Sequence, residues 1–322
     1  MRRMTDLLRA GKKTKREGVE ATEVEEKPAT EKAEEAKAPS RFHSALNLIR
    51  EACSRDEIVP ELWRRITAAA EAVLEDVLIS PETAMDFILN ATIEAESYVH
   101  IHMLNLSILS SLIWKELGGG EVATVCAIGM IHDIGIFDLP WDLIHGGPIS
   151  DPDSRRSIEE HPRHTLRRLE PLKGTIPDEM IKAVYQEHER IDGSGYPEGM
   201  GGEEITPLGK IIQVADLFEA ITHPRPYREK HMEPFEAMCH IVREVKEGRL
   251  DREVVKRFID LVSMYPVGSF VELSDGRIGK VISATKGAPF RPRVAVEGKT
   301  EIIDLMERPD LYIRRQTSTP AL

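Results

Sequence analysis

The stretch that decides the fold is residues 122–139, "VATVCAIGMIHDIGIFDL", in which a mainly apolar run ends abruptly in His132 and Asp133. An imidazole beside a carboxylate at the end of a buried segment has two explanations. The polar pair either faces water at a helix end or binds a metal ion. The rest of the chain has to separate these alternatives.

Composition narrows the classes of function. The chain has 322 residues with 41% apolar content, which is enough for a sizeable core. Its formal charge of -12, from 43 Lys and Arg against 55 Asp and Glu, argues against general nucleic-acid binding, so we expect no DNA partner. Three scattered cysteines, no apolar run of about 20 residues and no signal-peptide centre predict a soluble, cytoplasmic protein without a transmembrane segment.

The pattern along the chain predicts a mainly α fold with a small β-barrel-like module at its end. Residues 1–40 have the composition of a disordered charged tail, and 41–98 form a helical N-terminal region. A helical domain over 99–264 is predicted from amphipathic stretches separated by Gly- and Pro-rich loops. Its helices are expected at 99–117, 121–133, 151–170, 177–190, 207–221, 233–247 and 251–264. Residues 265–322 are rich in short β-type runs, with a hairpin turn at Asp275-Gly276.

Polar residues recur within or just after these apolar stretches, where an unpaired charge costs several kcal/mol. A lone buried histidine is more often a hydrogen-bonded core residue than a ligand. Together, however, a His, an adjacent His-Asp about 30 residues later and a distal Asp suit a divalent metal ion held between helices. Imidazole and carboxylate ligands are typical of Zn, Mn or Fe sites. The candidate ligands are His102, His132, Asp133, His161, Glu187, His188 and Asp216.

Four motifs resemble the HD-GYP group of the HD phosphohydrolase superfamily, whose members are cyclic di-GMP phosphodiesterases. They are "HDIG" at 132–135, "HPRH" at 161–164, "HERIDGSGYP" at 188–197 and "VADLFEAITHPRPYR" at 214–228. The resemblance covers about residues 98–263. The segment "YPVGSFVELSDGRIGKVI" also looks like the short β module that often follows this domain.

The resemblance implies a helical bundle with two divalent ions, which are Fe, Mn or Zn. Asp133 bridges the ions and acts with His132 in catalysis, and the other candidate ligands complete the site. A hydroxide bridging the ions attacks a 3'-5' phosphodiester of cyclic di-GMP. The residues implied in substrate binding are Tyr196, Arg225 and Arg228.

Three positions depart from the family pattern. Ile136 replaces the Lys of HDxGK, Glu187 replaces the first of two adjacent histidines, and Tyr98 stands where trinuclear members have an acidic ligand. Two functions therefore stay open, an active dinuclear phosphodiesterase and a catalytically weak or inactive cyclic di-GMP receptor. The receptor would bind a signalling protein through the GYP loop or the N-terminal helices. A nucleotidase acting on another phosphate ester is a third reading.

Overall fold

The computed structural model describes residues 40–90, 98–145, 151–225 and 230–317. The tail predicted at 1–40 lies outside these residues except for Ser40, the first residue of α1. The N-terminal region contains three helices, as predicted from its sequence. They are α1 (Ser40–Cys53), α2 (Pro60–Ile79) and α3 (Pro81–Asn90).

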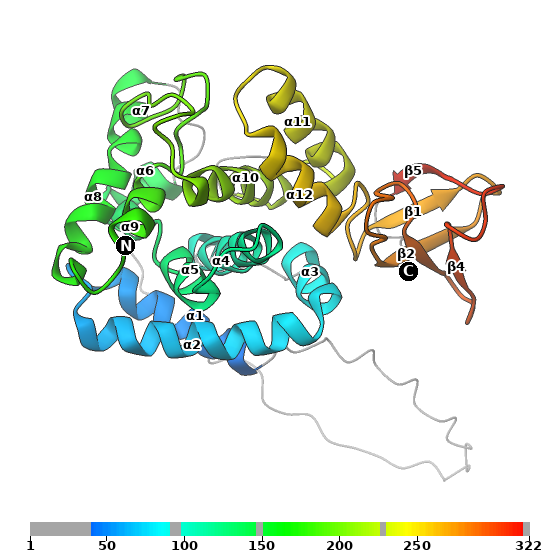
Figure 1. The fold of residues 1–322 in the computed structure, drawn as a ribbon, viewed down its shortest axis with the longest axis horizontal. Coiled ribbons are helices and arrows are strands. Elements are labelled where there is room, and N and C mark those ends of the chain that lie inside the picture. The colour runs from blue at the N-terminus through cyan, green and yellow to red at the C-terminus, as the bar shows by residue number, and fades with distance from the viewer. Residues whose placement is uncertain (1–39, 91–97, 146–150, 226–229, 318–322) are drawn as a thin grey trace, which may run out of the picture. The chain divides into compact units, whose positions relative to one another are not determined.

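The centre of the helical part is α4 (Tyr98–Glu116), which is buried around almost its whole circumference. A helix that is apolar on every side needs partners on every side. Figure 1 shows α4 at the centre of the helices, and it contacts α5 (Val122–Gly129), α10 (Pro207–Thr222), α1 and α12 (Arg252–Val262). The remaining helices are α6 (Trp141–His145), α7 (Pro152–Glu159), α8 (His161–Arg168), α9 (Asp178–Tyr185) and α11 (Pro234–Lys246), with 3-10 turns η2 (Ile134–Asp138) and η3 (Glu170–Leu172).

Three helices end earlier or break where the sequence predicted continuity. The helix predicted at 121–133 ends at Gly129, and the one predicted at 177–190 ends at Tyr185. The helix predicted at 151–170 is divided at Glu160, because Pro162 lacks the N–H that a continuous helix needs. Each break places candidate ligands at a helix end or in a turn.

Residues 270–317 form a five-stranded antiparallel sheet in the order β4-β3-β2-β1-β5. The predicted hairpin is confirmed, since Glu272 pairs with Ile278 across the Asp275-Gly276 turn. The mainly α fold class with a small C-terminal β module is therefore confirmed. The strands are β1 (Phe270–Leu273), β2 (Ile278–Ser283), β3 (Arg293–Val296), β4 (Ile302–Asp304) and β5 (Ile313–Thr317).

The sheet is tied to the helical part by polar contacts. Ser263, just after α12, donates its hydroxyl to the carbonyl oxygen of Pro289 at 2.7 Å. Lys280 of β2 lies 2.7 Å from a carboxylate oxygen of Asp86 in α3. The sheet region therefore contacts both the residue after α12 and the N-terminal helix α3.

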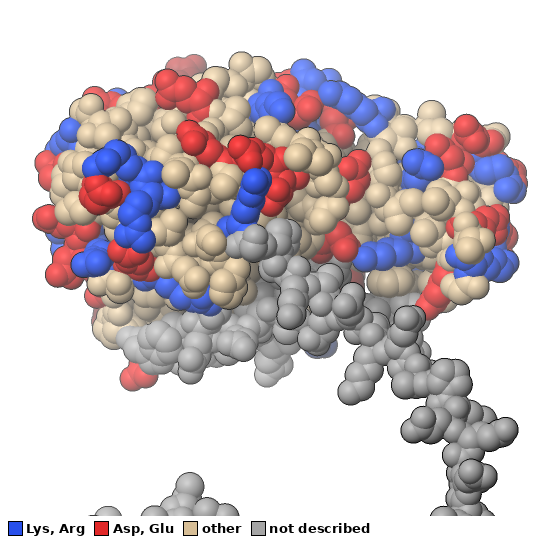
Figure 2. All heavy atoms as spheres, turned by 90° about the horizontal axis from the view of Figure 1, so that it is seen from below, with Lys and Arg blue, Asp and Glu red and all other residues tan. Residues whose placement is uncertain are grey.

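The surface carries both charges side by side. On the face in Figure 2, Lys and Arg are interspersed with Asp and Glu wherever described residues are seen. A basic stripe of the kind that binds a nucleic-acid backbone is therefore not seen there. Within the described ranges, no helix is both long and apolar enough to cross a membrane.

Candidate metal centre

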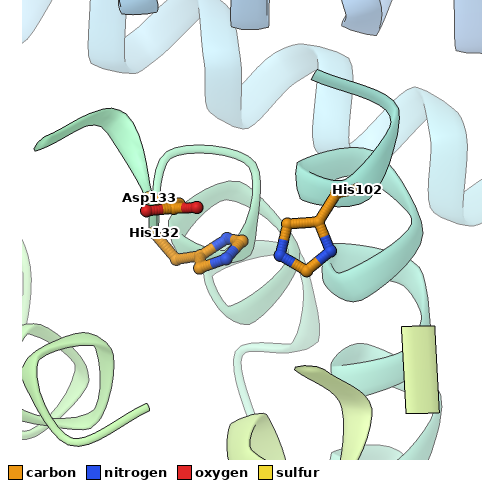
Figure 3. Close-up of side chains that lie close together, drawn as sticks. All are labelled: His102, His132 and Asp133. Atoms are coloured by element: carbon orange, nitrogen blue, oxygen red, sulfur yellow. The ribbon is translucent and has the colours of Figure 1, made fainter. Parts of the chain in front are cut away.

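Two groups of three side chains meet between the helices. The first trio consists of His102 from α4 and of His132 and Asp133 from the turn after α5. Figure 3 shows the rings of His102 and His132 facing each other with Asp133 alongside, and the ring centroids lie 5.2 Å apart. The early end of α5 matters here, because adjacent residues of a continuous helix point in directions about 100° apart.

The second trio consists of His161, Glu187 and His188. His161 is the first residue of α8, and the other two lie in the turn after α9. His161 Nε2 is 3.1 Å from His188 Nε2 and 3.2 Å from Glu187 Oε1. Breaks in the helices therefore place these ligands, as they place the first trio.

Two aspartates connect the trios. Asp133 Oδ1 lies 3.3 Å from His161 Nε2, across the site from its own trio. Asp216, on α10, has Oδ1 3.4 Å from His102 Nε2 and Oδ2 3.5 Å from His188 Nδ1. All seven ligand candidates predicted from the sequence are thus brought together in one site.

The atoms at the centre of the second trio fit a cation. The Nδ1 of His161 donates to the carbonyl oxygen of Ile158 at 2.6 Å, which leaves Nε2 as an acceptor in the neutral ring. That lone pair faces oxygens of Asp133 and Glu187. Asp133 Oδ1 and Glu187 Oε2 are buried and accept no hydrogen bond. Buried acceptors that face one another need a positive charge between them, so these residues fit a divalent ion.

Electrostatics agree with that fit. Burial lowers the pKa of the His132 imidazole to about 4, so this ring is neutral and ready to bind metal. Burial also opposes the charging of His161, but the carboxylates of Asp133 and Glu187 outweigh it and raise the pKa of His161 to about 9. Burial and the charge of Asp133 raise the pKa of Glu187. The second trio thus attracts positive charge.

A contact between main chains sets the distance between the two trios. Gly135, in the turn that follows Asp133, lies so close to α8 that an added Cβ would be 2.3 Å from the carbonyl oxygen of His161. Its N–H donates to the hydroxyl of Thr165 at 3.0 Å. Only glycine allows this approach. The turn holding Asp133 and the helix end holding His161 are consequently fixed against each other.

Two supporting residues escaped the sequence analysis. Glu219 of α10 is buried, and His102 Nδ1 lies 2.5 Å from its Oε2. Glu189 is also fully buried and accepts the backbone N–H groups of Glu198 and Met200 at 2.8 and 2.9 Å. The sequence could have indicated Glu219, because this residue follows Asp216 by three positions and therefore lies on the same face of the helix. No sequence pattern indicated Glu189, because its partners are backbone amides, which every residue type except proline provides.

The loop held by Glu189 forms the open side of the site. Tyr196 stacks on His188 with ring centroids 4.7 Å apart. Arg163 of α8 binds the same loop, with Nη2 2.7 Å from a carboxylate oxygen of Glu198. Between α7–α8 and this loop lies a cleft of about 280 Å³. Its walls are Arg156, Ser157, Glu159, Glu160, Arg163, Tyr196 and Pro197.

The remaining predicted residues have different environments. Arg225 lies beside the first trio, with Nη2 3.3 Å from His102 Nδ1. Tyr98 directs its hydroxyl to the carbonyl oxygen of Ile144 at 3.2 Å, and Ile136 packs against the apolar core. Arg228 falls outside the described residues. The substrate-binding roles predicted for Tyr196, Arg225 and Arg228 stay predictions.

Comparison with known families identifies two parts of the chain. Residues 116–254 match the HD domain, and residues 270–319 match the KOW domain associated with the HD domain. The first match contains every ligand candidate except His102, which precedes it on α4. The second covers the sheet described above.

Curated relatives are enzymes acting on cyclic dinucleotides. The chain is 29% identical over 229 residues to a cyclic di-GMP phosphodiesterase of Pseudomonas aeruginosa, covering 70% of this chain and 54% of the relative. It is 35% identical over 155 residues to 3'3'-cGAMP-specific phosphodiesterase 1 of Vibrio cholerae, covering 48% of this chain and 35% of the relative. The alignments thus span about half or less of these relatives' lengths.

A solved structure supports the fold. An HDGYP protein from Bdellovibrio bacteriovorus superimposes with a TM-score of 0.56 at 18% identity, covering 71% of this chain and 74% of that one. At this identity the likeness concerns the fold alone. The family match and the relatives confirm the resemblance seen in the motifs: residues 116–254 match an HD domain, and homologues of the chain are named cyclic di-GMP phosphodiesterases.

Proposed function

We propose that this protein is a metal-dependent phosphodiesterase that hydrolyses a 3'-5' phosphodiester of cyclic di-GMP. The observation that carries the proposal is the convergence of seven imidazole and carboxylate side chains, among which two buried carboxylate oxygens accept no hydrogen bond. The names of the relatives supply the substrate class.

The ligand set supports a centre for two divalent ions, Fe, Mn or Zn. His102, His132 and Asp133 would hold one ion, and His161, Glu187 and His188 the other, with Asp133 and Asp216 placed to reach both. Two such ions would lower the pKa of bound water so that a nucleophile is available at neutral pH, and they would stabilise the charge that develops on the phosphate oxygens. Two divalent ions would offset the negative charges of the three carboxylates, so the centre would no longer repel a phosphodiester anion.

The open side of the site supports a direction for substrate entry. Of the seven candidate ligands, His188 has the most exposed side chain at 18%, against at most 10% for the other six, and its ring stacks on Tyr196. A phosphodiester therefore approaches along the cleft beside Tyr196. In this proposal Tyr196 contacts the substrate while its stacking holds the ring of His188 in place.

One observation favours the alternative of a catalytically weak or inactive receptor. Ile136 packs its apolar side chain against the core at the position where the family has a phosphate-binding Lys. A receptor would keep the metal centre and the cleft and bind cyclic di-GMP without turnover. A signalling protein could then contact the GYP loop or the N-terminal helices.

The test uses the full chain, purified anaerobically and supplied with Mn²⁺ or Fe²⁺. Metal analysis should find about two ions per chain. Incubation with cyclic di-GMP, 3'3'-cGAMP and mononucleotides in parallel should give hydrolysis of cyclic di-GMP, and Asp133→Ala should give none. Tight cyclic di-GMP binding without product favours the receptor. Cleavage of mononucleotides alone favours a nucleotidase, and a chain that takes up no metal refutes both the enzyme and its centre.

A further inference from the structure

Glu219 is the most heavily hydrogen-bonded carboxylate next to the metal centre. It is 1% exposed and lies on α10 one turn after Asp216. Its Oε2 is 2.5 Å from His102 Nδ1 and 3.2 Å from Arg225 Nη2, and its Oε1 accepts from Asn105 Nδ2 at 3.3 Å. His102 and Asn105 are one turn apart on α4, so the two helices face each other through this carboxylate.

The contact fixes the orientation of His102. With the Nδ1 of His102 in contact with Glu219, its other nitrogen, Nε2, faces Asp216 and is the atom available to a metal ion. His132 and His161 are oriented in the same way, but by neutral groups, the carbonyl oxygens of Gly129 and Ile158. Of these three imidazoles, His102 is therefore the one whose Nδ1 contacts a charged group, the carboxylate of Glu219. Such a carboxylate holds the ring and increases its basicity as a ligand.

A buried carboxylate in this position has an electrostatic cost. It adds a negative charge beside three others, those of Asp133, Glu187 and Asp216. Burial opposes its ionisation, but His102, His223 and Arg225 more than compensate and hold the pKa of Glu219 well below its usual range. A permanent cation beside Glu219 would keep this carboxylate ionised and held against His102.

Arg225 is placed to provide that cation. Its side chain is 13% exposed, and its guanidinium lies over the ring of Tyr98, 5.9 Å from the centroid. A guanidinium stays charged at every physiological pH, and stacking on an aromatic ring fixes its plane. Its Nη2 lies 3.3 Å from His102 Nδ1, the ring nitrogen that also contacts Glu219.

We propose that Glu219 and Arg225 form a neutral supporting pair that positions His102, and that Arg225 thereby acts on a metal ligand rather than on the substrate phosphate. Both are positioning residues in this sense. The inference rests on the proposed metal centre but not on turnover, so it can be tested even if the protein is a receptor.

The test measures Mn²⁺ affinity in the full chain by chelator competition, and KM for cyclic di-GMP at saturating Mn²⁺. Arg225→Ala and Glu219→Gln should each weaken Mn²⁺ binding about 10- to 100-fold, the range typical of groups that support metal ligands. Arg225→Lys, which keeps the charge, should recover most of the affinity. KM at saturating metal should stay within about two-fold of the wild-type value.

A matched control separates this role from general destabilisation. Arg249→Ala removes another Arg–Glu pair, in which Nε is 2.7 Å from Glu244, far along the chain from any ligand. It should leave Mn²⁺ affinity unchanged, and thermal unfolding in chelator should show all variants folded.

Two outcomes overturn the proposal. Arg225→Ala with wild-type Mn²⁺ affinity and a raised KM makes Arg225 a substrate clamp. Equal loss of affinity in Arg225→Lys and Arg225→Ala shows that charge is not what matters. A wild-type chain that binds no Mn²⁺ instead removes the metal centre itself. One that binds Mn²⁺ without hydrolysis refutes the enzyme and leaves the supporting pair measurable.

Discussion

The two trios of the metal centre use similar ligands in different surroundings. His102 and His132 sit among long, buried helices, and Glu219 and the carbonyl oxygen of Gly129 hold their outer nitrogens. His161, Glu187 and His188 stand at helix ends and in a turn, and their open side meets Tyr196 and the cleft. In the proposed function, this difference would let the first trio hold metal while the second also meets the substrate beside His188.

Asp133→Ala should have the largest effect, because this carboxylate faces both trios. Losing a ligand should weaken metal binding by more than the 10- to 100-fold that supporting residues cause, and hydrolysis should disappear. His188→Ala affects the second trio alone, so metal analysis should find about one ion per chain in it and fewer in Asp133→Ala. Equal metal content in the two variants would contradict the division into trios. Asp142→Ala, an exposed acid of α6, is the matched control.

Gly135→Ala should disturb the distance between the trios. The added Cβ would meet backbone atoms of His161 and Thr165 at 2.3 Å, and such overpacking costs about 1–3 kcal/mol of unfolding free energy. Denaturant unfolding measures this loss, and metal affinity should fall with it. Gly120→Ala introduces the same methyl where no atom lies within 4 Å, so it should behave as wild type. A neutral Gly135→Ala variant would show that α8 moves freely.

pH should act in opposite directions on the metal-free and metal-loaded protein. Folding raises the pKa of His161 from 6.5 to about 9 and also raises that of Glu187, so the folded metal-free chain binds more protons than the unfolded chain. Its stability therefore falls as pH rises from about 7 to 9, by up to about 3 kcal/mol for His161.

Metal ions must displace those protons, so apparent Mn²⁺ affinity should rise over the same window, about ten-fold per pH unit for each proton released. Thermal unfolding with and without Mn²⁺ at pH 7 and 8.5 measures both effects. A stabilisation by Mn²⁺ that is equal at the two values would show that the second trio does not release protons on binding.

Ile136→Lys should have the smallest effect of these changes, and it should alter substrate binding without altering metal binding. A charge-assisted hydrogen bond contributes about 1.5–3 kcal/mol, but the apolar packing of Ile136 is lost. We therefore expect KM for cyclic di-GMP to fall about 3- to 10-fold with metal content unchanged. Ile136→Met, which lengthens the side chain without charge, should leave KM as it is. Unchanged KM in Ile136→Lys would place the substrate phosphate elsewhere.

The sequence was sufficient to select the candidate ligands that the fold brings together, but not to predict how they are placed. His102 and Asp216 were found because a polar residue inside an apolar helix requires compensation. The helix end at Gly129 was missed because the apolar run continues through Met130 and Ile131. The end at Tyr185 was missed because residues 186–190, "QEHER", contain no Gly or Pro that would signal a stop. Pro162 was the one break with a local signal.

Contacts between distant segments were harder to foresee. Glu219 was readable as a residue on the same face as Asp216, but its partner His102 lies 117 residues away in sequence. The family pattern assigned Arg225 to the substrate, whereas in the fold its guanidinium contacts Glu219 and the ring of Tyr98.

The contact between Gly135 and α8 has a consequence for how such a centre can diversify. Because the contact joins the backbone of the turn at Gly135 to the backbone of α8, the distance between the two trios should stay the same when a candidate ligand is replaced. Glu187 in place of a histidine therefore changes donor type, charge and metal preference without resizing the centre. A substitution at position 187 can therefore change which ion the site prefers, whereas a side chain at position 135 would push α8 away and change the distance between the two trios.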